Sequence, residues 1–111
     1  MSFFDSDMVK EDMKSISEIQ RQIVKELPAF FAMTTAEKLA HIDLLEKLLE
    51  KQEIIYTRLC LSDDPEALQM KQQMRDSAQL LGFGDTPDIH EVFKTMKATV
   101  VGLRKTAIRD R

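Results

Sequence analysis

The sequence contains few residues that interrupt helices or carry catalysis. Its 111 residues include three glycines, three prolines, one tyrosine, two histidines and no tryptophan. So few glycines and prolines cannot supply the turns of a many-stranded sandwich or barrel, nor a glycine-rich phosphate loop. A single cysteine, Cys60, excludes an internal disulfide and a zinc site built from several cysteines.

Long hydrophobic runs are also missing. The longest apolar stretch covers residues 28–33, whereas a membrane-spanning helix needs about 20 residues. The N-terminal segment carries Asp5 and Asp7 where a secretory signal would carry basic residues. The sequence therefore predicts a soluble, cytoplasmic protein, and its lone cysteine is consistent with a reducing compartment.

The charge is unevenly distributed along the chain. The net charge is −3; residues 1–66 carry a net of −6 and residues 67–111 a net of +3. This asymmetry is too mild for a dedicated nucleic-acid-binding domain, whose surface is usually strongly basic. It leaves room for a basic patch near the C-terminal end.

Four amphipathic segments account for nearly the whole chain. Thr34 with Glu37 has the form of a capping box, Pro28 stops or kinks the first segment, and Pro65 suits the first turn of the third. Gly82 is placed as a left-handed C-terminal cap. We expect one all-α domain over residues 1–111, an antiparallel helical bundle with its first two helices longest. The expected helices cover residues 6–27, 35–61, 65–81 and 87–108.

In each segment a row of mainly apolar residues recurs at alternating steps of three and four, the heptad spacing of packed helices. We call this row the seam of the segment. Gln20 in the first seam either fixes register against a partner or lies at the seam's edge. Seams on all four helices, and the unequal helix lengths, favour a homodimer, although bundles tolerate overhang. The predicted seams are Val9, Met13, Ile16, Gln20, Ile23 and Leu27; Ile42, Leu45, Leu49, Gln52, Tyr56 and Leu59; Ala67, Met70, Met74, Ser77 and Leu81; and Ile89, Phe93, Met96, Val100, Leu103 and Ala107.

The titratable residues do not form a recognisable catalytic or metal motif. His41 follows Glu37 by four residues, which predicts an ordinary surface pair. Cys60 stands between two leucines and is expected to be a small buried hydrophobe. The acids near His90, and those near the start of the third helix, are expected to act as helix caps. We therefore expect no catalytic residue, metal site or cofactor, unless His41, His90 and Cys60 meet in one cleft.

Two surfaces are candidates for binding a partner. Phe30, Phe31 and Met33 occupy the junction between the first two helices, where they either form an exposed partner surface or plug the bundle's end. On the fourth helix, small residues form a stripe that either admits another helix or faces water. The stripe residues are Thr95, Thr99, Gly102 and Thr106. The same helix carries basic residues that either touch RNA or an acidic partner, or are solvated: Lys94, Lys97, Arg104, Lys105 and Arg109.

Three short runs follow one another in the order and at the spacing of a known family. They are Ser-Phe-Phe-Asp-Ser at residues 2–6 with Val9 after it, Leu-Ser-Asp-Asp at 61–64, and Leu-Gly-Phe-Gly-Asp-Thr-Pro at 81–87. Over almost its whole length the chain resembles a small family of uncharacterised domains shared by cyanobacteria and cyanophages. Residues 28–33 depart from the pattern of a cellular member, which favours a phage-encoded or divergent copy.

The resemblance implies no catalytic motif and identifies no contact residue. It implies a cyanobacterial or phage-infected host cytoplasm, and it suggests as partner the catalytic part of RNase E, which a family member is expected to bind and restrain. We therefore expect a non-enzymatic, protein-binding regulator. The alternatives are an RNA-binding protein that uses its basic C-terminal helix, and a purely structural dimeric accessory protein of the phage or host.

Overall fold

Helices are the only regular secondary structure in the part of the chain that the structure describes. The structure, a computed structural model, describes residues 3–84 and 88–109. It contains four α-helices, α1 (Asp7–Glu26), α2 (Thr35–Cys60), α3 (Pro65–Leu80) and α4 (Ile89–Arg109), and two 3-10 helices, η1 (Phe3–Asp5) and η2 (Leu27–Ala32). No strand occurs among the described residues, so the predicted all-α helical bundle is confirmed. The predicted start of the fourth helix, at residue 87, lies outside them.

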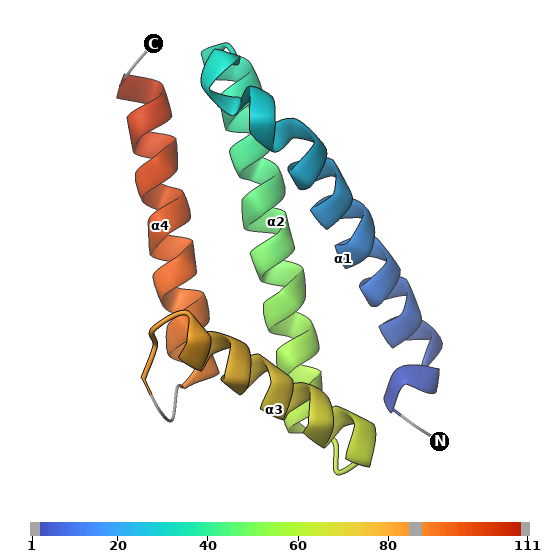
Figure 1. Ribbon diagram of the computed structural model, residues 1–111. Coiled ribbons are helices and arrows are strands. Elements are labelled where there is room, and N and C mark those ends of the chain that lie inside the picture. Colours follow the sequence, from blue (N-terminus) through green and yellow to red (C-terminus); the bar gives the residue numbers. More distant parts are fainter. Residues whose placement is uncertain (1–2, 85–87, 110–111) are drawn as a thin grey trace.

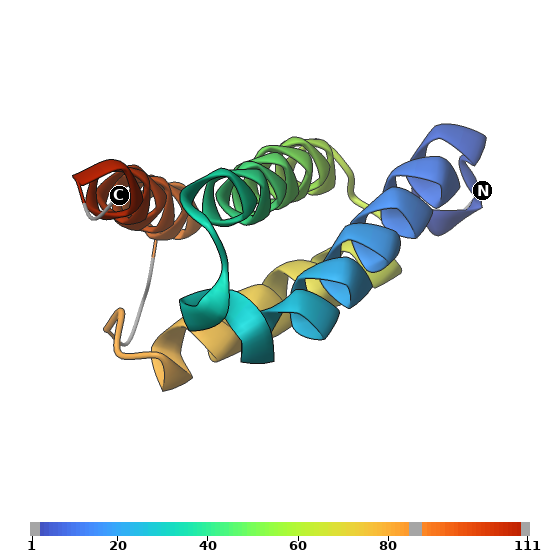
Figure 2. The same cartoon turned by 90° about the horizontal axis from the view of Figure 1, so that it is seen from above.

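Helix α2 forms the centre of the molecule. Helices α1 and α4 run antiparallel to it on either side, and α3 crosses the lower ends of α2 and α4 (Figure 1). Seen from above, α2 and α4 form one layer, and α3 lies on the same side of it as the C-terminal end of α1 (Figure 2). Helices α1, α2 and α4 therefore form the antiparallel part of the bundle, and α3 crosses its lower end.

One detail of the predicted helix lengths is wrong. Helix α2, with 26 residues, is the longest, but α1 has 20 residues and α4 has 21. The reason is Pro28, which lacks an N–H and so cannot continue the α-helical hydrogen bonds. The α-helix ends at Glu26, and the chain continues as the tighter turns of η2.

The predicted end signals of two helices are confirmed. Thr34 and Glu37 form both bonds of a capping box: Glu37 N–H donates to Thr34 Oγ1 (3.2 Å), and Thr34 N–H donates to Glu37 Oε1 (3.1 Å). The backbone N–H of Thr34, and then its side chain, hold the pKa of the Glu37 carboxyl below its usual value. Gly82 has a φ of 92°, and the N–H of Phe83 donates to the carbonyl of Ala78, as in a Schellman motif.

The buried side chains form two clusters that meet along α2. The larger cluster joins α2, α3 and α4, and the smaller joins α1, α2 and the start of α3. Most of the predicted seam is buried or half-buried, as expected from its spacing. Six predicted seam residues are instead exposed: Gln20, Leu27, Ser77, Leu81, Met96 and Leu103.

Candidate partner-binding groove

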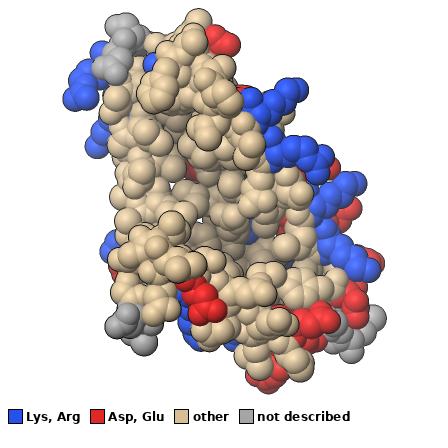
Figure 3. Space-filling model, viewed as in Figure 1, with Lys and Arg blue, Asp and Glu red and all other residues tan. Residues whose placement is uncertain are grey.

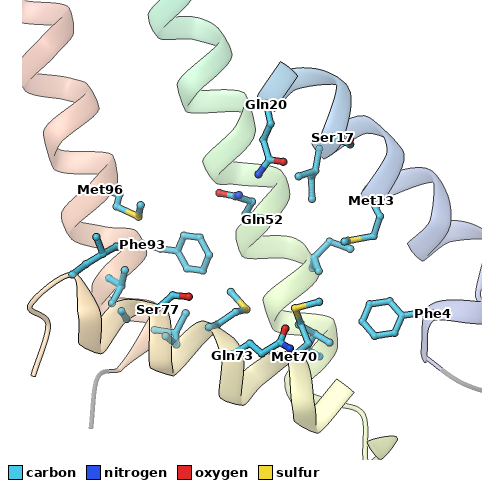
Figure 4. A pocket seen from close by; sticks show the side chains of 18 residues that line it. Phe4, Met13, Ser17, Gln20, Gln52, Met70, Gln73, Ser77, Phe93 and Met96 are labelled. Atoms are coloured by element: carbon cyan, nitrogen blue, oxygen red, sulfur yellow. The ribbon is translucent and has the colours of Figure 1, made fainter. Parts of the chain in front are cut away.

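A groove of about 640 Å³ opens between all four helices (Figure 4). Helix α2 lies behind it, α1 and α4 flank it, and α3 forms its lower edge. In the space-filling view it appears as a hollow surrounded mainly by uncharged residues, with Asp and Glu side chains farther down on the same face (Figure 3). Its lining residues are Phe4, Met13, Ile16, Ser17, Gln20, Gln52, Ile55, Leu59, Met70, Gln73, Met74, Ser77, Ala78, Leu81, Ile89, Val92, Phe93 and Met96.

The lining contains no charged residue, although 32% of the chain is Asp, Glu, Lys or Arg. It is mainly apolar, with glutamine and serine side chains between the apolar ones, and its volume lies within the ~300–1,000 Å³ of typical binding pockets. Methionine is unbranched and flexible, so it adapts to differently shaped partners. Four of the lining residues are methionines: Met13, Met70, Met74 and Met96.

The groove explains why part of the predicted seam is exposed. Of the six exposed seam residues, four line the groove: Gln20, Ser77, Leu81 and Met96. Gln52, a polar seam residue of α2, lines it as well and faces Gln20 across its upper end (Figure 4). These helix faces have the spacing of packed surfaces, but no other part of residues 3–84 and 88–109 covers them.

The two sides of the groove differ in charge. Ser17 lies on the α1 side and has Lys14 three residues before it and Arg21 four residues after it, so both neighbour it on the helix surface. Lys10 and Lys25 extend this row, and Lys and Arg side chains gather along the α1 edge (Figure 3). We call these four residues the α1 basic row; all are exposed, and none makes an ion pair with another described residue.

The α4 side carries no charge next to the groove. Thr99 and Leu103 follow Met96 at steps of three and four, so they continue its stripe up the helix, and all three are exposed. Thr99 donates a hydrogen bond from Oγ1 to the Thr95 carbonyl (3.1 Å). A Cβ added at Gly102 would touch nothing within 4 Å. Within the described chain the predicted small-residue stripe therefore faces solvent.

The junction between α1 and α2 does not line the groove. Phe31 is 91% exposed, whereas Phe30 and Met33 are half-buried. The centroids of the Phe30 and His41 rings lie 5.3 Å apart, and the Lys38 ammonium lies 5.7 Å from the centroid of the Phe30 ring. The two predicted alternatives therefore apply to different residues. Phe30 covers the end of the bundle, whereas Phe31 is exposed as a partner surface would be.

The prediction that His41 forms a surface pair with Glu37 is wrong. His41 is 2% exposed, and its Nδ1 makes no hydrogen bond in the described chain. Its nearest carboxylate belongs to Glu26, 3.8 Å away. The reason is that Glu37 turns back to cap Thr34, while η2 folds over this face of α2 and brings Phe30 onto the imidazole.

The basic residues of α4 are partly paired. Lys97 Nζ lies 2.7 Å from Glu53 Oε1, and Arg104 contacts both Asp43 (2.8 Å) and Glu46 (2.6 Å) on α2. Two of the five residues of the predicted basic patch are thus neutralised by α2. The other three are exposed and make no ion pair with a described residue: Lys94, Lys105 and Arg109.

Cys60 is exposed, so the prediction that it is buried is wrong. It follows Leu59, which fills the core, and consecutive side chains of a helix point about 100° apart. Burial, and then a hydrogen bond with Cys60, raises the pKa of Tyr56. The Tyr56 ring lies 5.2 Å from that of His90, whereas His41 is fifteen residues away along α2, about 22 Å. His90 and Cys60 both lie near Tyr56, but His41 does not, so His41, His90 and Cys60 do not meet in one cleft.

The predicted capping acids also have structural roles. Asp88 accepts a hydrogen bond from the His90 N–H (3.0 Å), and Asp64 accepts one from the Glu66 N–H (2.9 Å). Ser6 occupies the N-cap position of α1 but makes no capping bond with its side chain. Over residues 3–84 and 88–109, no three His, Cys, Asp or Glu side chains are arranged to hold a metal ion. Within the same residues, no helix has the length and apolarity required to cross a membrane.

Among known proteins, the chain is similar to one family. No curated protein matches it, and no solved structure matches it. A family model described as a domain of unknown function, DUF1825, matches residues 1–107. Because this match covers nearly the whole chain, the protein belongs to the DUF1825 family.

Proposed function

We propose that this protein acts by binding another protein, without catalysis, through the groove between its four helices. The observation that carries the proposal is the lining of that groove: eighteen residues from η1, all four α-helices and the C-cap of α3, none of them charged. An uncharged, methionine-rich hollow on a surface otherwise rich in charge is typical of a site that another apolar surface covers.

The arrangement of titratable groups supports binding over catalysis. A catalytic site needs a nucleophile or base in contact with an orienting partner inside a pocket. The groove lining contains glutamine and serine as its polar residues, and no His, Cys, Asp, Glu, Lys or Arg. The groove therefore supplies apolar contact and hydrogen bonds, which suit recognition.

The family resemblance suggests the first partner to test. It favours a cyanobacterial or phage-infected cytoplasm as the setting, and the catalytic part of RNase E as the bound protein. In this proposal the protein restrains RNase E by occupying part of its surface. The exposed Phe31 at the other end of the molecule is a second contact candidate for the same partner.

The rival function, RNA binding through α4, has less support. Lys97 and Arg104 already pair with acids of α2, so they offer less charge to phosphates. The one Phe, Tyr or Trp of α4 is Phe93, which is buried, so none of these rings is exposed beside the basic residues for a base to stack on. A homodimer remains the alternative occupant of the groove, because it too would cover an uncharged helical surface.

The test measures binding of the purified catalytic part of RNase E to the wild-type chain and to Ser77→Arg. Ser77 is exposed and lies in the groove, so an arginine there puts a long charged side chain into the hollow. Gln72→Arg is the matched control, because Gln72 is exposed on the same helix but does not line the groove. We expect at least a tenfold loss of affinity for Ser77→Arg only.

Two further results would contradict parts of the proposal. Equal affinity of all three proteins would remove the groove as the binding site. A Phe30→Ala/Phe31→Ala variant that alone loses binding would move the site to the junction. Sedimentation of the wild type at micromolar concentration as a 12.8 kDa particle would exclude the homodimer.

A further inference from the structure

The groove has the shape and lining of a site for a helix. Its apolar lining comes from helix faces whose residues recur at steps of three and four, and helices pack when such rows interdigitate. A helix that enters a groove of this kind presents apolar anchors at positions i, i+3, i+4 and i+7. Methionines on several walls let the lining adjust to the anchors of the incoming helix.

The α1 basic row adds a requirement on charge. Two basic side chains beside other helix contacts are paired: Arg58 of α2 contacts Asp12 of α1, and Lys97 of α4 contacts Glu53 of α2. The row formed by Lys10, Lys14, Arg21 and Lys25 follows the α1 wall of the groove and makes no ion pair with a described residue. An acidic flank on the occupant would complete these contacts.

The opposite wall sets no such requirement. Along α4 the residues that continue the stripe of Met96 are uncharged and mostly small, namely Thr99, Leu103 and Thr106. A helix can approach such a wall closely. The two walls together therefore distinguish the two flanks of an occupant, with acidic residues on one side and small or apolar residues on the other.

We infer that the groove takes an amphipathic helix of a partner protein, with its apolar stripe in the hollow and acidic residues along the flank that faces α1. The inference rests on the proposed function, because it names the class of partner segment for the same groove. It also predicts the orientation about the helix axis, since only one flank can face the basic row.

A second copy of this chain satisfies these requirements less well. The exposed apolar residues of α4 on its outer face, Val101 and Ile108, both have Lys105 beside them on the helix, and Lys94 lies about two turns before Val101 on the same face. In a self-association through this face, basic side chains would meet the α1 basic row, and like charges repel. Charge complementarity therefore favours a different, acidic chain.

The experiment uses two designed helical peptides of about 20 residues with the same leucine and methionine stripe. One has glutamates along a single flank, and the other has glutamines there. Fluorescence anisotropy measures their binding to the purified full-length chain at low salt and at 0.5 M NaCl. We expect the glutamate peptide to bind about five- to tenfold more tightly at low salt, and the difference to shrink at high salt, because exposed ion pairs are weak and screened.

Matched charge reversals locate the contact. Lys14→Glu/Arg21→Glu changes the α1 basic row, and Lys94→Glu/Lys105→Glu makes the same change in net charge on the far side of α4. All four residues are exposed, so both variants keep the fold, which circular dichroism checks. We expect the first variant to lose the preference for the glutamate peptide and the second to keep it.

Several results would overturn the inference. It fails if both peptides bind equally, or if the two charge-reversed variants behave alike. It fails if neither peptide binds, even when RNase E binding is still lost in Ser77→Arg, in which case the proposed function stands without it. It also fails if a single-stranded RNA oligonucleotide binds and is released by Lys14→Glu/Arg21→Glu, or if the chain forms a dimer that Ser77→Arg dissociates.

Discussion

Phe3 and Asp64 are joined by a hydrogen bond that ties the N-terminal turn to the start of α3. The backbone N–H of Phe3 donates to Asp64 Oδ2 (2.8 Å), while Oδ1 of the same carboxylate accepts from the Glu66 N–H (2.9 Å) and caps α3. One side chain thus holds two elements that are 61 residues apart in sequence. Phe4, the next residue, lines the groove, so this contact fixes that end of the site.

Asp64→Ala is therefore expected to lower the free energy of unfolding by about 1–2 kcal/mol, because it removes a helix cap and leaves the Phe3 N–H without its acceptor. Urea denaturation measures the change. Asp63→Ala is the control, since Asp63 is exposed and makes no hydrogen bond with a described residue. Equal losses in the two variants would show that neither the cap of α3 nor the contact with Phe3 stabilises the fold.

The capping box of α2 predicts a specific pH dependence. The backbone and side chain of Thr34 lower the pKa of Glu37 from its ordinary value of 4.5, so the folded state binds a proton less readily than the unfolded state. The stabilising contribution of the carboxylate is complete above that value and is lost as the pH falls through the lower, folded-state pKa. We expect wild type to be more stable than Glu37→Gln at pH 7, and the difference to shrink as the pH falls below 4.5 and through the lower, folded-state pKa.

Thermal unfolding of both proteins between pH 7 and pH 3 measures this difference. Glu50→Gln is a suitable control, because Glu50 is exposed in the interior of α2, away from its capping box. A gap between wild type and Glu37→Gln that is independent of pH would contradict the assignment of the effect to the carboxylate.

The two phenylalanines of the junction are expected to respond differently to substitution. Phe30 is half-buried against His41, so Phe30→Ala should destabilise the fold by about 1–3 kcal/mol, since a large aromatic contact is lost. Phe31 is 91% exposed, so Phe31→Ala should change stability by less than about 0.5 kcal/mol. Chemical denaturation of the two single variants checks this. A large loss in Phe31→Ala would mean that its ring packs against the protein in solution.

The helices themselves could be predicted because local physics decides them. The capping box at Thr34, the glycine at position 82 and the proline at position 28 each act within a few residues, and each appears where the sequence predicted an end. The crossing of α3 could not be predicted, because heptad spacing defines which face of a helix is apolar but not the direction of its neighbour. His41 was misplaced for a similar reason: its burial depends on how η2 folds over α2, a contact between segments.

The groove left a signal in the sequence that seam spacing alone did not resolve. Three predicted seam positions carry polar residues, Gln20, Gln52 and Ser77, each on a different helix. The structure brings all three to the same groove. A polar residue in a seam therefore marked a helix face that no other described segment covers. Only the arrangement of the helices shows that these three faces line one groove.

These polar seam residues are expected to limit self-association through the groove. Replacing both glutamines in Gln20→Leu/Gln52→Leu enlarges the continuous apolar surface of the hollow, and large exposed apolar patches promote association. We expect sedimentation equilibrium to show stronger self-association of this variant than of wild type at the same concentration. Gln22→Leu/Gln69→Leu makes the same chemical change at exposed positions outside the groove, and it should behave like wild type. If both double variants associated to the same extent, general surface hydrophobicity would explain the effect, and the polar residues of the groove would have no special part in it.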